Sequence, residues 1–260
     1  MSRFVSLGVN IDHIATIRNA RGSLYPNMLR ACQIVADNAN LITIHLREDR
    51  RHITDADLEL ICKKRPCPVN LEIGLNWQIT QIAIAAKPDF VCIVPEKREE
   101  VTTESGLNIA LQSVFDKLVD MVPQFTSAGI SVSLFLDPSD ANIQIIKTLL
   151  QTGCKIAAVE VHTGKYSHLC DLHKDAEANE EIAKITSFAA KLANLGIKVN
   201  AGHGLTFNNV GKIAAIDYVS ELNIGHFLIT EAIFTGLEGA IKTMRNIIDK
   251  HTNVNGNKGR

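Results

Sequence analysis

The sequence lacks the features that mark membrane, secreted and nucleic-acid-binding chains. No apolar run approaches the roughly 20 residues that span a bilayer. The net charge is only −1, from 27 Lys and Arg against 28 Asp and Glu, which argues against general binding to nucleic acid or to a membrane surface. Residues Met1–Asn10 contain no apolar stretch followed by a small-residue cleavage site, so we expect a cytoplasmic protein.

Closely spaced cysteine pairs are also missing from the sequence. The six cysteines include no C-x-x-C pair, and most of them have apolar neighbours. This usage predicts reduced, partly buried thiols rather than disulfides or a zinc site. The cysteines are Cys32, Cys62, Cys67, Cys92, Cys154 and Cys170.

Apolar residues make up 46% of the 260 residues, enough for one large core. Short apolar runs alternate with longer helical stretches, and the runs are nearly continuous in apolar residues, as in a parallel sheet buried on both faces. Eight strands are predicted, at Val5–Asn10, Leu41–His45, Val69–Ile73, Phe90–Val94, Ser131–Leu136, Ala157–His162, Lys198–Ala201 and Tyr218–Ile224.

Helical periodicity and start signals fill the intervals between these runs. Asp137-Pro138 precedes one predicted helix, and Thr54 with Asp57 three residues later forms a variant capping box before another. The predicted helices are Thr54–Lys64, Gln78–Ala86, Phe115–Thr126, Ser139–Leu150, Glu177–Leu195, His226–Phe234 and Leu237 to about Lys250. The polar tail Thr252–Arg260 is expected to be disordered.

Eight strands alternating with helices and no linker predict one (β/α)₈ barrel domain over residues 1–260. A doubly wound sheet is the alternative, but it usually has fewer strands and a Gly-rich turn after the first. Here Asn10–His13 takes that place, so we expect no dinucleotide site.

Polar residues collect where the predicted strands end, which is where barrels carry their active sites. Five of the nine histidines lie there, and such a cluster suits repeated proton transfer or metal binding. These five are His13, His45, His162, His203 and His226.

Two carboxylates lie inside apolar strands. Glu72 in Val69–Ile73 must be paired or protonated, and burial would make it a usable general base; a structural ion pair with an arginine is the alternative. Glu160 between Val159 and Val161 is a similar case, with structural support and transition-state electrostatics equally open.

Glycine turns and arginines suggest anion sites. Gly202-His203-Gly204 and Gly225-His226 follow the last two strands, where barrels often bind phosphate. Arg47 follows a strand-end histidine and could hold a second anion, whereas Arg50 is expected to be only a solvated charge.

Two predicted loops also bear on the site. Arg18 and Arg21, in the loop predicted after the first strand, could also reach an anion. The polar loop Glu96–Gly106 reads equally as a lid or as a mobile surface loop.

Long segments resemble the pyridoxine 5′-phosphate synthase family of vitamin B6 biosynthesis. The resemblance spans residues 4 to about 246 in the family's order and is weakest in Ser105–Val122 and the tail. The segments that carry it are Gly8–Gly22, His45–Asp55, Val94–Arg98, Val101–Glu104, His162–Gly164, Val199–Thr206 and Glu221–His226.

This resemblance implies a (β/α)₈ TIM barrel with extra helices, assembled as a homo-octamer. It implies a transferase without cofactor or metal that condenses 3-amino-2-oxopropyl phosphate with 1-deoxy-D-xylulose 5-phosphate. The products would be pyridoxine 5′-phosphate, phosphate and water. We expect small phosphorylated substrates as the ligands, and neither nucleic acid nor membrane as a partner.

The resemblance also implies roles for individual residues. His45 and Glu72 would accept protons, His203 would donate one, and Glu160 would stabilise a transition state. The residues implied for the amino-ketone phosphate are Asn10, Arg21, Gly204, Gly225 and His226. Those implied for deoxyxylulose phosphate are Asp12, His13, Arg47, His52 and Thr102.

Two other functions remain open on the residues alone. A metal-dependent hydrolase or epimerase could use Asp12, His13, His45 and His162 as ligands, although no His-x-His follows the first strand. A non-catalytic ligand-binding barrel is the other alternative, but its binding face would not need so many acid–base residues.

Overall fold

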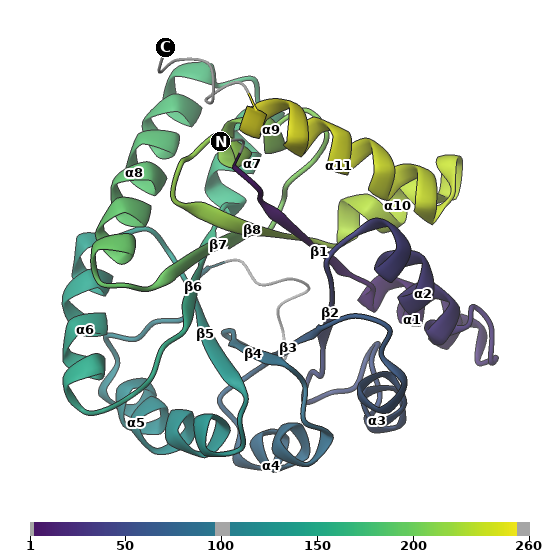
Figure 1. Ribbon diagram of the computed structural model, residues 1–260, viewed down its shortest axis with the longest axis horizontal. Coiled ribbons are helices and arrows are strands. Elements are labelled where there is room, and N and C mark those ends of the chain that lie inside the picture. Colours follow the sequence, from purple (N-terminus) through teal and green to yellow (C-terminus); the bar gives the residue numbers. More distant parts are fainter. Residues whose placement is uncertain (1–2, 97–104, 254–260) are drawn as a thin grey trace.

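The computed structural model describes residues 3–96 and 105–253, and its strands close into one parallel barrel in chain order (Figure 1). The closing pair joins the first strand to the last, with Ser6 opposite Glu221. The predicted TIM barrel is therefore confirmed. Its strands are β1 (Ser6–Asn10), β2 (Leu41–His45), β3 (Val69–Ile73), β4 (Phe90–Ile93), β5 (Ser131–Leu136), β6 (Ala158–His162), β7 (Lys198–Gly202) and β8 (Val219–Ile224).

Helices surround this barrel and exceed one per strand, so the expected extra helices are present (Figure 1). Within residues 3–96 and 105–253, every helix is too short or too polar to span a bilayer. The helices are α1 (Asp12–Arg21), α2 (Met28–Asn38), α3 (Asp55–Lys64), α4 (Trp77–Ala86), α5 (Gln112–Ser127), α6 (Asp140–Gln151), α7 (Gly164–Asp171), α8 (Asp175–Asn194), α9 (Val210–Ala214), α10 (His226–Thr235) and α11 (Leu237–Asn253).

The two faces of the strands separate apolar from polar side chains. On β2, Ile42 and Ile44 are fully buried in the main hydrophobic cluster. Thr43, between them, donates to Asn223 Oδ1 of β8, which is not a neighbour of β2, so it faces the barrel interior. A polar interior under an apolar outer layer puts hydrogen-bonding groups around the barrel axis.

The structure corrects the region after the first strand. The segment predicted as a loop with Arg18 and Arg21 is helix α1, because Ile14 and Ala15 pack inward from its first turn. Arg18 does not face an anion site: it forms an ion pair with Asp57 of α3 at 2.5 Å. Arg50 is likewise more than a solvated charge, since it pairs with Asp55 at 2.8 Å.

Helices α2, α7 and α9 were not among the predicted elements. The expected disordered tail also begins too early: Thr252 lies in α11 and is buried. Residues 254–260 lie outside the described part of the chain. The free cysteines agree with the expected thiols, and four of the six are buried.

The capping box predicted at the start of α3 is confirmed and gives a stability test. Thr54 accepts from the backbone N–H of Asp57, and the Asp57 carboxylate accepts from the backbone N–H of Thr54. Thr54→Ala removes the side-chain acceptor, so we expect about 1 kcal/mol less stability. Urea unfolding of the two proteins measures this difference; an unchanged midpoint would show that the cap contributes nothing.

Candidate active site

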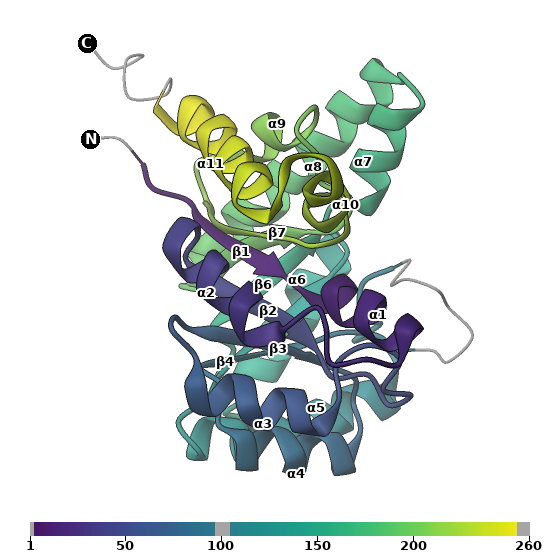
Figure 2. The ribbon, with the colours of Figure 1, turned by 90° about the vertical axis from the view of Figure 1, so that its right-hand side faces the viewer.

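The carboxyl ends of the strands carry the polar residues that the sequence predicted there. Figure 2 shows β1 leading directly into α1 at this end of the barrel. Parallel strands place all their carboxyl ends at one rim, so residues far apart in sequence meet there.

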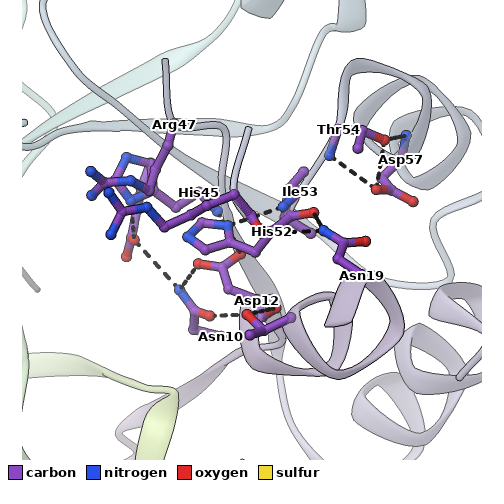
Figure 3. A network of polar contacts seen from close by, with 12 residues as sticks. Asn10, Asp12, Asn19, His45, Arg47, His52, Ile53, Thr54 and Asp57 are labelled. Atoms are coloured by element: carbon purple, nitrogen blue, oxygen red, sulfur yellow. Dashed lines mark hydrogen bonds and ion pairs between the residues drawn. The ribbon is translucent and has the colours of Figure 1, made fainter. Parts of the chain in front are cut away.

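Asn10, Asp12, His45 and His52 form the first cluster (Figure 3). Asn10 Nδ2 donates to Asp12 Oδ2 at 2.9 Å, and Asp12 Oδ1 accepts from the backbone N–H of His45 at 2.9 Å. The same Asp12 oxygen lies 3.8 Å from His52 Nδ1, which itself accepts the N–H of Ile53. Burial lowers the pKa of His52, so its ring is set as a neutral imidazole.

His45 stands between two carboxylates. Its Nδ1 lies 3.9 Å from Glu72 Oε2, and its Nε2 lies 3.5 Å from Glu96 Oε2. Burial and the negative charges of Glu160 and Asp12 raise the pKa of Glu72 well above its usual value. The side chain of Glu72 keeps 18% exposure at the barrel mouth, so it can meet a substrate. A carboxyl group with these properties suits proton abstraction near neutral pH.

Glu96 behaves in the opposite way. Burial opposes its ionisation, but the contact with His45 and the N–H of Glu48, 2.7 Å away, together lower the pKa of Glu96. It is therefore a fixed anion that orients His45.

Glu160 lies deeper in the barrel. It accepts from Asn223 Nδ2 at 2.8 Å, and Asn223 also donates to Glu221 at 3.2 Å. Burial raises the pKa of Glu160 to about 8, against the effect of the Asn223 hydrogen bond and with the repulsion of Glu221. The side chain is thus largely neutral at pH 7 and can donate a hydrogen bond.

His203 and His162 form a second imidazole cluster. Their ring centroids are 5.0 Å apart, and Phe135 contacts both rings. Burial, with His162 nearby, lowers the pKa of His203 to about 4. His203 is therefore neutral near neutral pH in the resting site.

The start of α10 follows β8, the strand that pairs with β1, and so lies beside the first cluster at the mouth. The rings of His13 and His226 meet edge to face at 5.0 Å, and burial, with His226 nearby, lowers the pKa of His13. A Cβ at Gly225 would lie 2.8 Å from Asn10 Cβ, so only glycine lets this turn approach Asn10. The first cluster and the α10 turn are therefore adjacent.

Not every predicted residue joins these clusters. Arg21 is exposed at the end of α1. Thr102, and most of the Glu96–Gly106 loop predicted as a lid or surface loop, lie outside the described residues. Arg47 is buried at the mouth and lies 3.3 Å from Asp49. Gly204 follows His203 and packs close to Ser167.

The structure brings together a different set of possible metal ligands from the set that the sequence predicted. Among residues 3–96 and 105–253, one set could place its ligand atoms within 4.8 Å of one another: Asp12, His45 and His52. His162 pairs instead with Asp137, so the four predicted ligands do not come together.

Sequence reasoning missed several residues of the site. Glu96 follows a predicted strand, so the strand-end rule that selected His45 could have found it. Asn223 and Glu221 are on the last predicted strand, but nothing in the sequence shows that Asn223 bonds both Glu221 and Glu160, two strands away on β6.

Solved structures with this architecture include several barrels of low sequence identity. N-(5′-phosphoribosyl)anthranilate isomerase from Pyrococcus furiosus has a TM-score of 0.60 at 11% identity, covering 95% of this chain and 99% of that one. Orotidine 5′-monophosphate decarboxylase from Methanocaldococcus jannaschii has the same TM-score, identity and coverage. At this identity the likeness shows the fold alone.

Sequence comparison is more specific. The family model described as pyridoxal phosphate biosynthesis protein PdxJ matches residues 7–250. A pyridoxine 5′-phosphate synthase of Zymomonas mobilis is 49% identical over 251 residues, which cover 96% of this chain and 93% of the relative. Matches of this extent show that the chain belongs to the PdxJ family of pyridoxal phosphate biosynthesis proteins.

Proposed function

We propose that this chain is a pyridoxine 5′-phosphate synthase, condensing 3-amino-2-oxopropyl phosphate with 1-deoxy-D-xylulose 5-phosphate. The observation that carries the proposal is the placement of His45 between Glu72 and Glu96 at the barrel mouth. The 49% identity to a synthase of this name supports it.

The condensation consists of proton-coupled steps. The amine of one substrate attacks the ketone of the other to give a carbinolamine and then an imine; loss of phosphate, loss of water and ring closure follow. We assign proton abstraction to His45 and Glu72, because Glu96 orients the imidazole and burial makes Glu72 basic enough. His203 delivers a proton to a leaving oxygen.

Glu160 has a different role in this proposal. Its side chain is buried and is largely neutral at pH 7. A neutral carboxyl group stabilises developing negative charge by donating a hydrogen bond.

Two phosphorylated substrates require two anion sites. The first consists of Asn10, Gly204, Gly225 and His226, with Arg21 as a further contributor, and binds the amino-ketone phosphate. The start of α10 supports this assignment, because a helix N-terminus favours anions. The second binds deoxyxylulose phosphate, and we assign to it Asp12, His13, Arg47, His52 and Thr102.

We also propose that the enzyme is cytoplasmic, uses no cofactor, and assembles as a homo-octamer. These proposals rest on membership of the family. Analytical ultracentrifugation tests the assembly, and a species smaller than an octamer at assay concentrations would contradict it.

The function is tested by mixing purified protein with both substrates and following the ultraviolet absorption of pyridoxine 5′-phosphate. We expect product only when both substrates are present. No product when both substrates are present, or an equal signal when one substrate is omitted, would overturn the proposal.

Metal removal separates this proposal from a metal-dependent hydrolase. Because the histidines are assigned to proton transfer and substrate contact, we expect EDTA to leave the rate of product formation unchanged. Loss of activity that zinc or manganese restores would instead assign Asp12, His45 and His52 to a metal.

A further inference from the structure

Asp137 and His162 form a pair at the barrel mouth that the proposed mechanism does not use, with the imidazole buried and the carboxylate half exposed. His162 ends β6, and its Nδ1 lies 2.8 Å from Asp137 Oδ1, just after β5. The other Asp137 oxygen accepts the backbone N–H of Gly106 at 3.0 Å. Both carboxylate oxygens are held, so the carboxylate fixes the orientation of the imidazole.

The opposite nitrogen of His162 is aimed into the site. His162 is only 7% exposed, and its Nε2 has no hydrogen-bond partner among the described residues. A Cβ at Gly164 would lie 2.4 Å from this Nε2 and 2.9 Å from His203 Cδ2. The absence of a side chain at Gly164 therefore lets both rings approach one point at the start of α7.

A buried nitrogen without a partner costs free energy, so such an atom calls for an explanation. The imidazole of His203 lies next to that of His162. The simplest explanation is that His162 exchanges a proton with His203 or with a substrate group beside it. The titratable groups that face His162 are Asp137 from the β5 end and His203 from the β7 end. Glu160, two residues earlier on β6, bonds Asn223 instead.

His203 needs such a partner. With a pKa of about 4, set by burial and by the neighbouring His162, it holds no spare proton near neutral pH. A neutral imidazole can give up its N–H only if its other nitrogen gains a proton. The pair beside it can supply one, because a carboxylate hydrogen-bonded to an imidazole favours the imidazolium. That hydrogen bond also lowers the pKa of Asp137, which keeps the carboxylate ionised.

We propose that Asp137 and His162 act as a dyad that stores the proton which His203 delivers to the leaving oxygen. The inference rests on the proposed function, because it deepens the role given there to His203. His162 gives up the proton on Nε2, and His203 gains one proton on one ring nitrogen and gives one from the other. The sum is one proton moved from His162 to the oxygen, with Asp137 ionised throughout. Water returns a proton to His162 before the next turnover.

Two substitutions separate the parts of the dyad. His162→Asn keeps an amide near the position of Nδ1, so the bond to Asp137 can persist, but it removes Nε2. Asp137→Asn keeps the shape and removes the charge. We expect kcat to fall by about 10²-fold in His162→Asn and by less in Asp137→Asn, with little change in KM. His168→Asn, an exposed position on α7, is the matched control and should keep full activity.

The double variant tests whether Asp137 acts through His162. If it does, Asp137→Asn adds no further loss of kcat once His162 is Asn. If Asp137 only anchors Gly106, the two losses multiply, and this result would overturn the dyad. Thermal unfolding of each variant separates loss of fold from loss of chemistry.

The pH profile distinguishes a proton store from a structural pair. The store must be protonated, so kcat falls as pH rises past its titration. Removing the Asp137 charge disfavours the imidazolium, so the alkaline limb of Asp137→Asn should move to lower pH. A structural role lowers kcat at every pH and leaves the limb in place.

A readout independent of activity is the ¹⁵N chemical shift of each histidine ring in the substrate-free protein, assigned with the Asn variants. We expect the pH dependence of the His162 ring shifts to change in Asp137→Asn, because the carboxylate bonded to its Nδ1 is gone. Wild-type protein that forms no product overturns the proposed function. Wild-type protein that is active, with an alkaline limb and a His162 titration that Asp137→Asn leaves unmoved, overturns the dyad alone.

Discussion

Glu72→Gln is expected to lower kcat by about 10²–10⁴-fold and to leave the fold intact, the range that removal of a general base produces. Glutamine has nearly the same shape but cannot take a proton. The carboxylate lies 3.9 Å from His45 Nδ1, and burial together with the neighbouring carboxyl groups of Glu160 and Asp12 raises the pKa of Glu72, so the glutamate is both placed and basic enough for abstraction. Steady-state kinetics with both substrates measure the loss.

Stability provides the control for this variant. The pKa of Glu72 is raised above its unfolded value, so the folded state binds this proton more tightly. The contribution of Glu72 to stability is therefore fully present below the unfolded pKa and is lost as pH rises through the raised pKa. Glutamine resembles the protonated form, so the variant should be at least as stable as the wild type at pH 8. Glu59→Gln, on the exposed face of α3, should change neither property. A kcat near that of the wild type in Glu72→Gln would remove Glu72 from the catalytic groups.

His203→Asn is expected to lower kcat by about 10²-fold or more, with a modest change in KM. His203 has a φ of 82°, a left-handed conformation that asparagine tolerates better than most residues, so the turn should persist. Loss of a proton donor acts on the transition state, whereas loss of uniform binding raises KM and spares kcat. A variant whose kcat survives while KM rises for one substrate would place His203 in phosphate binding.

The same substitution has a signature in stability. An unfolded histidine titrates at about pH 6.5, and His203 in the folded protein titrates at about 4. Between these values the unfolded chain binds more protons, so this residue's contribution to stability is lost as pH falls from about 6.5 towards 4. Urea unfolding of His203→Asn should show a shallower loss over this window, and an unchanged slope would show that His203 is not buried as a neutral group.

The barrel and the rim of the site could be predicted because the strands of a parallel sheet buried on both faces appear in the sequence as continuous apolar runs. Every strand begins and ends at, or within one residue of, its predicted bounds, and β2, β3 and β5 match them outright. Once the strands are known, their carboxyl ends must share one rim, which brings His45 and Glu72 together as expected.

Other features depend on contacts that no local pattern records. α1 was missed because few of its residues are buried and its polar face resembles a loop. Arg18 was assigned to an anion because its partner, Asp57, lies 39 positions away in α3. The neutral state of His203 arises from burial and from the neighbouring His162, so it could not be predicted from the residues around it in sequence.

The most direct test of the account measures phosphate and pyridoxine 5′-phosphate together in one anaerobic reaction containing EDTA. The assigned chemistry moves protons and eliminates phosphate and water, so no metal or external oxidant takes part. We expect one inorganic phosphate for each pyridoxine 5′-phosphate, at the rate seen in air without chelator. Phosphate released without pyridoxine 5′-phosphate, or product that forms only when metal or oxygen is restored, would contradict it.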